Sequence, residues 1–459
     1  MYFLIAIFSG VLASLGFAPY GVWLAPVISL FILFIILKGS GLPSRLLISY
    51  LFGLSILLPN QFWTGTYVGD LPWIVLALLQ SFLFLPLAVV SQKGGRFNPW
   101  LFSCAVVVTE LALRTIPFTG FGWSRLSFTQ VDGLFSPLYP LIGSVGIIFL
   151  ISYLVSNRNI LIFTTILLAI AVLNFIDISE QKSGEMKIAL VQGGVTNLGL
   201  EFNSSPREVF QRHLFQTKSK ISPDQVDLII WPENSVDVDL FSNIDIKNTL
   251  IETSKVLNTP ILVGGITRVS GDLQNISVLF DPEVQDIYVK RYLTPFGEYI
   301  PLRTFLEMFS TLTNNVDDFS AGNSSNSIQI ADFDAQIFIC YELLNDVFKN
   351  QINSDFLIVQ TNNATFGDTP QLDQELQIAR VRALESAREV AYVSTTGVTS
   401  FIDRNGKVKS ELPKFKSDVL IDTVSTYSDR QINQKMGFTP EIFSIFMIIL
   451  LLNRIRRAR

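Results

Sequence analysis

Hydrophobic and polar positions divide the chain into two parts with different patterns. Residues 1–180 form long apolar runs with few charges, whereas residues 181–435 alternate short apolar runs with polar and charged segments. A membrane-spanning helix needs about 20 mostly apolar residues, and lipid forces its backbone groups to bond within the span. The pattern therefore predicts a helical membrane part, followed by a soluble part long enough for a core of its own.

The membrane part contains seven candidate spans, and an eighth follows the soluble part. We place them at residues 2–18, 22–37, 46–64, 71–91, 99–115, 135–156, 160–177 and 439–453. The first has no basic segment before it and others follow closely, so we expect a retained helix and not a cleaved signal peptide. The expected domains are a seven-span transmembrane domain at 1–178, a soluble domain at 185–435, and a C-terminal transmembrane helix with a basic tail at 439–459.

The basic residues of the loops are unevenly divided between the two sides of these spans. If the N-terminus is cytoplasmic, Arg114 and Arg125 are the only basic residues of the short loops between spans that fall outside the cytoplasm. The cytoplasmic loops and tail then hold Lys38, Arg45, Lys93, Arg96, Arg158, Arg454, Arg456, Arg457 and Arg459. The excess of cytoplasmic Lys and Arg predicts that the soluble domain is extracytoplasmic and the C-terminus cytoplasmic. The basic tail is then a membrane anchor, and we expect no nucleic-acid partner.

Two ionisable residues of the fifth candidate span lie four positions apart. Glu110 and Arg114 in "TELALRT" can pair on one helix face. Ionisable groups at membrane depth are functional candidates by default, but a pair that fixes the following loop explains them equally. Cys104, in the same apolar helix, is interpreted as packing.

The soluble part has the pattern of an α/β domain. Short runs rich in β-branched residues recur from "MKIALVQ" at 186–192 to "VTSFID" at 398–403. Helical patterns at 205–220, 245–257 and 371–388 separate some of these runs. Strands mixed with helices of this length predict a sheet-based domain with several strands buried on both faces.

Three of the predicted strands end in a chemically useful residue. "DLIIWPE" ends in Glu233, "IYVKRYL" carries Lys290, and "AQIFICYE" ends in Cys340 and its two neighbours. Each alone has an ordinary explanation: a solvated turn residue, an edge lysine and a packed thiol. Together they supply a thiol nucleophile, a carboxylate base and a positive charge for an oxyanion.

The single histidine argues against a Cys-His mechanism. A cysteine reacts as its thiolate, so a base must accept its proton. His213 lies in the polar helix "PREVFQRHLFQT" without an acidic partner at a useful spacing, and it is interpreted as a surface or packing histidine. Glu233 is then the candidate base. The sequence also shows no Cys/His cluster for zinc and no phosphate-binding glycine loop, so we expect no metal or cofactor.

Three motifs resemble a known family. "WPEN" at 231–234, "VKRYLTPFGEYIP" at 289–301 and "ICYELL" at 339–344 occur in the order and at about the spacing of the Glu-Lys-Cys triad of the nitrilase superfamily. With the membrane spans before and after, the whole chain resembles the apolipoprotein N-acyltransferase family. The resemblance implies a multi-span helical bundle joined to a nitrilase-like α-β-β-α sandwich.

The resemblance also implies roles for individual residues. Glu233 is the general base, Lys290 the oxyanion and acid/base partner, and Cys340 the nucleophile. Supporting positions are Glu298, Tyr341 and Glu342. Two positions depart from the family: Thr365 stands where a Trp often precedes Phe366, and the Trp after the first strand has no clear match, with Phe202 nearby. Phe366 and Phe202 are therefore expected in substrate-facing loops.

The expected function is acyl transfer in the bacterial cytoplasmic membrane. An acyl chain would pass from a membrane phospholipid, through a thioester on Cys340, to the α-amine of the N-terminal S-diacylglyceryl cysteine of a lipoprotein. Two alternatives stay open: a membrane-tethered nitrilase-type amidase acting on small amides, and a transporter or receptor with a soluble ligand-binding domain. Eight spans exceed what tethering needs, and a transporter should carry more charges within its spans. The sequence gives no sign of an oligomer.

Overall fold

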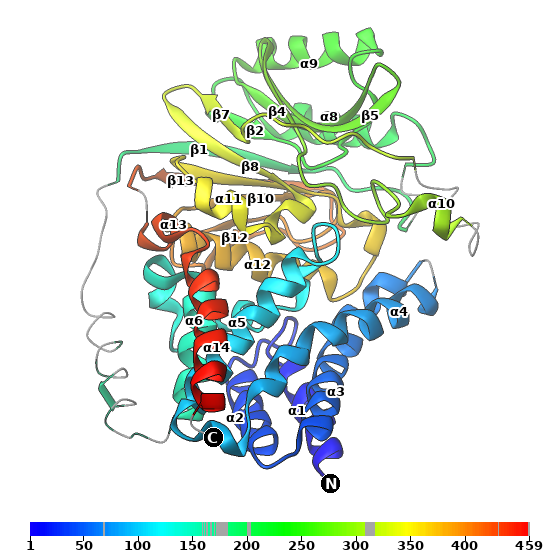
Figure 1. Ribbon diagram of the computed structural model, residues 1–459. Coiled ribbons are helices and arrows are strands. Elements are labelled where there is room, and N and C mark those ends of the chain that lie inside the picture. Colours follow the sequence, from blue (N-terminus) through cyan, green and yellow to red (C-terminus); the bar gives the residue numbers. More distant parts are fainter. Residues whose placement is uncertain are drawn as a thin grey trace. The chain divides into compact units, whose positions relative to one another are not determined.

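The computed structural model describes residues 1–67, 69–157, 182–199, 203–307, 317–429 and 431–457, with a few isolated positions between 159 and 170. The chain forms two compact units, Met1–Ser179 with Gln431–Arg459, and Glu180–Arg430 (Figure 1). The predicted span at 160–177 lies almost entirely outside the described residues, and Phe202 lies outside them as well.

The first unit is helical. Its α-helices in the described ranges are α1 (Tyr2–Ser14), α2 (Leu24–Lys38), α3 (Leu42–Gln61), α4 (Asp70–Ser81), α5 (Asn98–Thr115), α6 (Tyr139–Ser156), α13 (Ile432–Met436) and α14 (Thr439–Arg457). Among the residues that the structure describes, three helical segments are long and apolar enough to cross a membrane, namely Leu42–Gly65, Asp70–Val89 and Ser136–Ser156. Helices α1 and α2 are apolar but shorter. These segments fit a membrane bundle, while the eight-span topology stays a prediction.

The two ionisable residues of α5 have partners from distant parts of the chain. The Glu110 carboxylate accepts hydrogen bonds from the backbone N–H and hydroxyl of Ser127, at 2.8 and 2.7 Å, and from Arg125 Nε at 3.3 Å. Arg114 forms an ion pair with Glu441 of α14. Glu110 thus fixes the loop that follows its helix, as one of the two interpretations expected. Glu110 also forms an ion pair with the fully buried Arg125, because a buried guanidinium needs an anion beside it.

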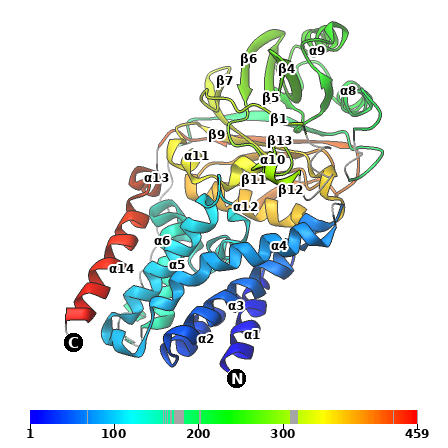
Figure 2. The same ribbon diagram turned by 45° about the vertical axis from the view of Figure 1, so that its right-hand side comes forward.

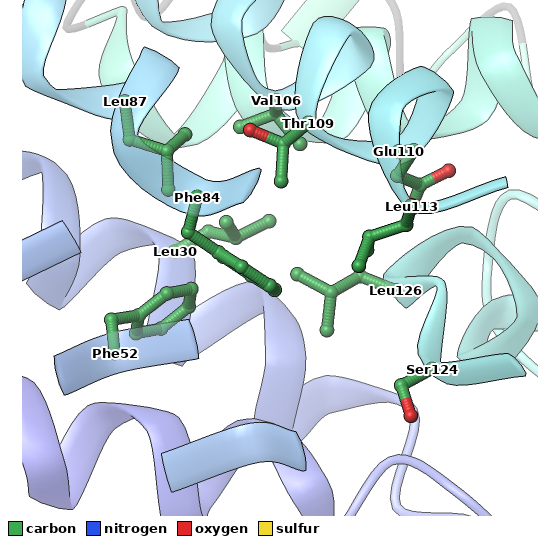
Figure 3. Close-up of a pocket in the computed structure, with 10 residues that line it drawn as sticks. All are labelled: Leu30, Phe52, Phe84, Leu87, Val106, Thr109, Glu110, Leu113, Ser124 and Leu126. Atoms are coloured by element: carbon green, nitrogen blue, oxygen red, sulfur yellow. The ribbon is translucent and has the colours of Figure 1, made fainter. Parts of the chain in front are cut away.

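A small pocket lies within the helical unit beside Glu110 (Figure 3). Its lining is apolar except for Thr109, Glu110 and Ser124. The Thr109 hydroxyl bonds a carbonyl of its own helix at 2.9 Å, and the Ser124 hydroxyl accepts hydrogen bonds from Asn60 and Gln61. Because the polar groups at its edge are already paired, the pocket is a gap in side-chain packing and offers no free polar group to a ligand.

The second unit contains two sheets. The first has the strand order β13 (Asp418–Thr426), β1 (Gly184–Gln192), β2 (Leu228–Ile230), β4 (Ile261–Val269), β5 (Asp272–Asp281) and β6 (Glu283–Val289), with β3 (Val236–Asp239) also paired to β4. The second has the order β12 (Val408–Glu411), β11 (Ser400–Ile402), β10 (Val390–Ser394), β9 (Phe356–Thr361), β8 (Phe333–Ile339) and β7 (Ser327–Ile330). Strands β1, β2 and β4 run parallel, as do β8, β9 and β10, so their carboxyl ends meet at common edges.

The two sheets pack face to face, and helices cover their outer faces (Figures 1 and 2). The core between the sheets contains fully buried Ile188 and Ile230 from one sheet and Ile337 and Ile358 from the other. Helices α8 (Glu208–Lys220) and α9 (Ile244–Leu257) form a second core against the first sheet. Helix α12 (Gln371–Ser386) contacts β10 of the second sheet, beside the short α11 (Asp346–Gln351). The expected α-β-β-α sandwich is confirmed.

Three short or polar strands were not predicted, namely β3, β12 and β13. The longest of them, β13, pairs with β1 along its whole length, from Gly184 opposite Thr426 to Gln192 opposite Asp418. Its side chains are mostly half-buried, because it lies at the edge of its sheet. An edge strand carries a weaker apolar signal than a central strand, so its sequence "DVLIDTVST" does not stand out.

His213 packs inside the sandwich, which is the second of the two interpretations given for it. It lies on α8 with no exposed surface, 2.7 Å from the carbonyl oxygen of Val209 through Nδ1. Its ring centroid is 5.6 Å from that of Trp231, which immediately precedes the Pro232–Glu233 turn. Burial lowers the pKa of His213 from 6.5 to about 4. The neutral ring is therefore the form that the fold accommodates.

The depressed pKa of His213 predicts a pH-dependent stability. The unfolded chain binds this proton at a higher pH than the folded chain, so the contribution of neutral His213 is present above pH 6.5 and is lost as the pH falls toward 4. Between pH 7 and pH 5 we expect the full chain in detergent to lose about 2 kcal/mol more unfolding free energy than His213→Gln loses. Urea unfolding followed by tryptophan fluorescence measures the difference. Parallel pH profiles for the two proteins would contradict the assignment.

Candidate active site

The structure brings the three candidate reactive residues together at strand ends of both sheets. Glu233 follows β2, Lys290 follows β6 and Cys340 follows β8. The Nζ atom of Lys290 lies 3.2 Å from Oε1 of Glu233, and both side chains are almost fully buried. Both residues also interact electrostatically with the Cys340 thiol. A carboxylate, an ammonium and a thiol therefore share one buried site.

Glu233 is held in place through both carboxylate oxygens. Oε1 accepts a hydrogen bond from Asn275 Nδ2 at 2.8 Å, and Oε2 accepts one from the backbone N–H of Asn362 at 2.9 Å. Gly264 on β4 backs the same turn: an added Cβ would lie 2.4 Å from the Pro232 carbonyl oxygen and 2.7 Å from the Cα of Glu233. A side chain at position 264 would displace Glu233, which explains one of the two glycines of "LVGGI".

Lys290 lies between two carboxylates. Its Nζ is 2.9 Å from Oε2 of Glu298 and 3.2 Å from Oε1 of Glu233. Asn275 Nδ2 donates to Glu298 Oε1 at 2.6 Å and so joins the same two carboxylates. Burial alone would lower the pKa of Lys290, but Glu298 and Glu233 outweigh it and raise that pKa well above its usual value. The side chain is therefore a permanent buried cation.

Cys340 occupies a strained backbone position. Its φ of +48° lies in the left-handed region, which non-glycine residues rarely adopt. It begins the 3₁₀ turn Cys340–Leu344 directly after β8, so the chain bends sharply at the nucleophile candidate. Cys340 is partly exposed, whereas Tyr341 and Glu342 behind it are buried. A sharp strand-to-turn bend is also how other enzymes present a nucleophile to substrate.

The thiol of Cys340 is not ionised on its own. Burial raises its pKa well above the usual value, and the charge of Glu233 raises it further. Lys290 acts in the opposite direction. A reaction at this sulfur therefore needs a base that removes the proton, and Glu233 is the one of the predicted residues that can accept it.

Glu342 ties the Cys340 turn to the Lys290 segment. Its Oε1 accepts hydrogen bonds from the Tyr288 hydroxyl at 2.6 Å and from the backbone N–H groups of Arg291 and Tyr292 at 2.8 and 3.2 Å. Its Oε2 accepts one from the backbone N–H of Ile339 at 3.0 Å. The donors to Oε1 are neighbours of Lys290 in the sequence, and the donor to Oε2 directly precedes Cys340. This single carboxylate therefore sets the spacing of the two reactive residues.

The remaining predicted site residues have different outcomes. Phe366 lies in the 3₁₀ turn Asn363–Phe366 that follows β9, and it is half-buried. Phe202 falls outside the residues that the structure describes. The sequence reasoning missed Asn275 and Glu375. Asn275 lies in β5 among other polar residues, and Glu375 lies in a helix that contains several polar residues, so the sequence singles out neither of them.

Both units of the chain are similar to known protein families. The model of the apolipoprotein N-acyltransferase N-terminal domain matches residues 9–156, and that of carbon-nitrogen hydrolases matches residues 187–432. The apolipoprotein N-acyltransferase of Wigglesworthia glossinidia brevipalpis is 29% identical over 95% of this chain and 93% of its own. That of Haemophilus influenzae is 27% identical over 98% and 94%. Among solved structures, a CN-hydrolase superfamily protein from Xanthomonas campestris is 18% identical, with a TM-score of 0.41, over 52% of this chain and 91% of its own.

The four donors around Glu342 predict the effect of an isosteric change. Glu342→Gln replaces an acceptor oxygen with an amide N–H that faces donors, so at least one buried hydrogen bond is lost. We expect the melting temperature to fall by several degrees, consistent with a loss of about 1–3 kcal/mol, and the turnover number to fall with it. Glu283→Gln, an exposed change on the same strand as Tyr288, is the matched control. Equal melting temperatures for the two variants would contradict the bridging role of Glu342.

Proposed function

Because this chain belongs to the carbon-nitrogen hydrolase family and matches apolipoprotein N-acyltransferases along almost its whole length, we propose that Glu233, Lys290 and Cys340 are its catalytic triad. The chain is a membrane acyltransferase, and its activity is that of an apolipoprotein N-acyltransferase, which acts on lipoproteins. The observation that carries the triad is the contact of Lys290 with Glu233 beside a cysteine on a strained turn. Glu298, Tyr341 and Glu342 support it.

The first half of the reaction makes a thioester. Glu233 accepts the proton of Cys340, and the thiolate attacks the ester carbonyl of a membrane phospholipid. The positive charge of Lys290 and the backbone N–H of Tyr341 stabilise the oxyanion, and each such donor is typically worth about 3–4 kcal/mol. The C–O bond then breaks, and the lysophospholipid leaves with the proton that Glu233 holds.

The second half transfers the acyl chain to nitrogen. The α-amine of the S-diacylglyceryl cysteine of a lipoprotein attacks the thioester carbonyl, and Glu233 accepts an amine proton. The C–S bond breaks, an amide is formed, and the proton returns to the sulfur of Cys340. The two substrates thus react in turn at one nucleophile. Phe366 follows the carboxyl end of β9, next to the carboxyl end of β8 where Cys340 lies, and this position supports a substrate-facing role for it. We assign the same role to Phe202.

Topology follows from the same proposal. We place a seven-span domain at 1–178, the catalytic domain at 185–435 on the extracytoplasmic side, and a last helix at 439–459 with its C-terminus in the cytoplasm. The distribution of Lys and Arg over the predicted loops supports this orientation. A phospholipid donor fits an enzyme whose first unit carries helical segments long and apolar enough to cross a membrane.

Acyl loading of the purified enzyme tests the proposal. After incubation with phospholipid and no acceptor, intact-protein mass spectrometry should show one added acyl chain that neutral hydroxylamine removes. The adduct should be absent in Cys340→Ser and present in Cys104→Ser, because Cys104 is buried in the helical unit.

Two outcomes would contradict the assignment. An adduct that persists in Cys340→Ser would place the acyl chain on another residue. Folded enzyme that gains no adduct but releases ammonia from small amides would exclude the phospholipid donor and favour the amidase alternative.

A further inference from the structure

A second buried carboxylate lies beside the proposed nucleophile and has no part in the triad. Glu375 on α12 is only 1% exposed. Its oxygens accept hydrogen bonds from the Thr361 hydroxyl at 2.9 and 3.0 Å, from Asn363 Nδ2 at 2.6 Å and from Gln371 Nε2 at 3.2 Å. All three donors are neutral, and no ion pair in the described part of the chain includes Glu375. A buried carboxylate without a cation is costly in its charged form.

Thr361 connects this carboxylate to the reactive sulfur. Strand β9 runs parallel to β8 with Ile339 opposite Gln360. The next residues are Cys340, which directly follows β8, and Thr361, the last residue of β9. The Thr361 hydroxyl bonds Glu375 and also interacts with the Cys340 thiol. A threonine hydroxyl has one proton to donate. That proton goes either to Glu375 or to the sulfur, and the protonation state of Glu375 decides which.

The charges around Glu375 favour its neutral form. Burial raises the pKa of Glu375, and the charge of Glu233 raises it further, while its hydrogen-bond donors act against this. The Tyr392 phenol of β10 and the Cys340 thiol also face it, and Asp373 of its own helix pairs with Lys414. Glu233 is thus a like charge that acts on Glu375, whereas the cation Lys290 acts on the thiol.

We propose that Glu375 is a positioning residue that keeps a proton while the thiolate forms and so directs the Thr361 hydroxyl onto Cys340. Neutral Glu375 donates its O–H to Thr361 Oγ1, and Thr361 donates its own proton to the sulfur. Ionised Glu375 accepts the hydrogen bond of the Thr361 hydroxyl, so the thiolate has no donor from Thr361. Proton transfer from Cys340 to Glu233 leaves the proton of Glu375 in place. The inference rests on the proposed function, since it assigns a partner to the same nucleophile.

Alkylation of Cys340 by iodoacetamide tests the arrangement without a lipid substrate. Peptide mass mapping gives the rate at each pH for the full chain in detergent. Glu375→Gln should leave the midpoint of the rate profile close to that of wild type, because a neutral amide, like the protonated carboxyl, carries no charge and still donates to Thr361. Glu375→Leu should lower the rate at neutral pH about tenfold, the size expected when a hydrogen bond to a charged group is lost.

Two results would overturn the proposal. If Glu375→Gln is as slow as Glu375→Leu, the residue works as an anion; if neither changes the profile, it only supports the fold. Should Glu375→Leu fail to fold, Thr361→Val must be slow and Thr361→Ser restored toward wild type, and an unchanged Thr361→Val would again overturn it. If Cys340 of the folded wild type is not alkylated at any pH, the triad assignment fails instead, which separates the two claims.

Discussion

The buried ammonium of Lys290 is the interaction on which the site depends. It lies between Glu233 and Glu298, with one nitrogen within 3.2 Å of both carboxylates. Removing one member of such a group leaves a buried charge unpaired, which costs several kcal/mol. Much of the surrounding structure serves to hold this arrangement. Asn275 bonds both carboxylates, and Gly264 leaves room for the Glu233 turn.

Electrostatics also connects the ion pair to the strained cysteine. The charge of Glu233 opposes ionisation of the Cys340 thiol, while the lysine favours it. A thiol held in the neutral form until a base acts is protected from reaction in the absence of substrate. The strained backbone at Cys340 is kept by the four hydrogen bonds to Glu342, which fix the turn on both sides. Glu342 thus sets the position of Cys340, whereas the charges of Glu233 and Lys290 act on the protonation of its thiol.

The sequence pattern predicted an α/β domain and the three reactive positions from local signals, whereas the sandwich was implied by the resemblance of three motifs to a known family. Apolar β-branched runs mark central strands, and polar residues directly after such runs mark the ends where sites form. What it could not predict depends on distant contacts. The i, i+4 spacing suggested a Glu110–Arg114 pair, but it could not show that Arg125 and Glu441, from other parts of the chain, also form ion pairs with these two residues. Glu375 likewise acquires its importance only through the register that sets Thr361 beside Cys340.

The pairing of β1 with β13 has a consequence for the architecture of the chain. These are the first and last strands of the soluble unit, and Gly184 lies opposite Thr426 in their antiparallel register. The chain therefore enters and leaves this unit one strand spacing apart, about 5 Å. To the helical unit, the roughly 240 residues of the sandwich are therefore an insertion whose two ends lie as close together as the ends of a short loop. Such an insertion adds little loop-closure entropy to the helices, so the two folds can be combined in one polypeptide without either stretching the other.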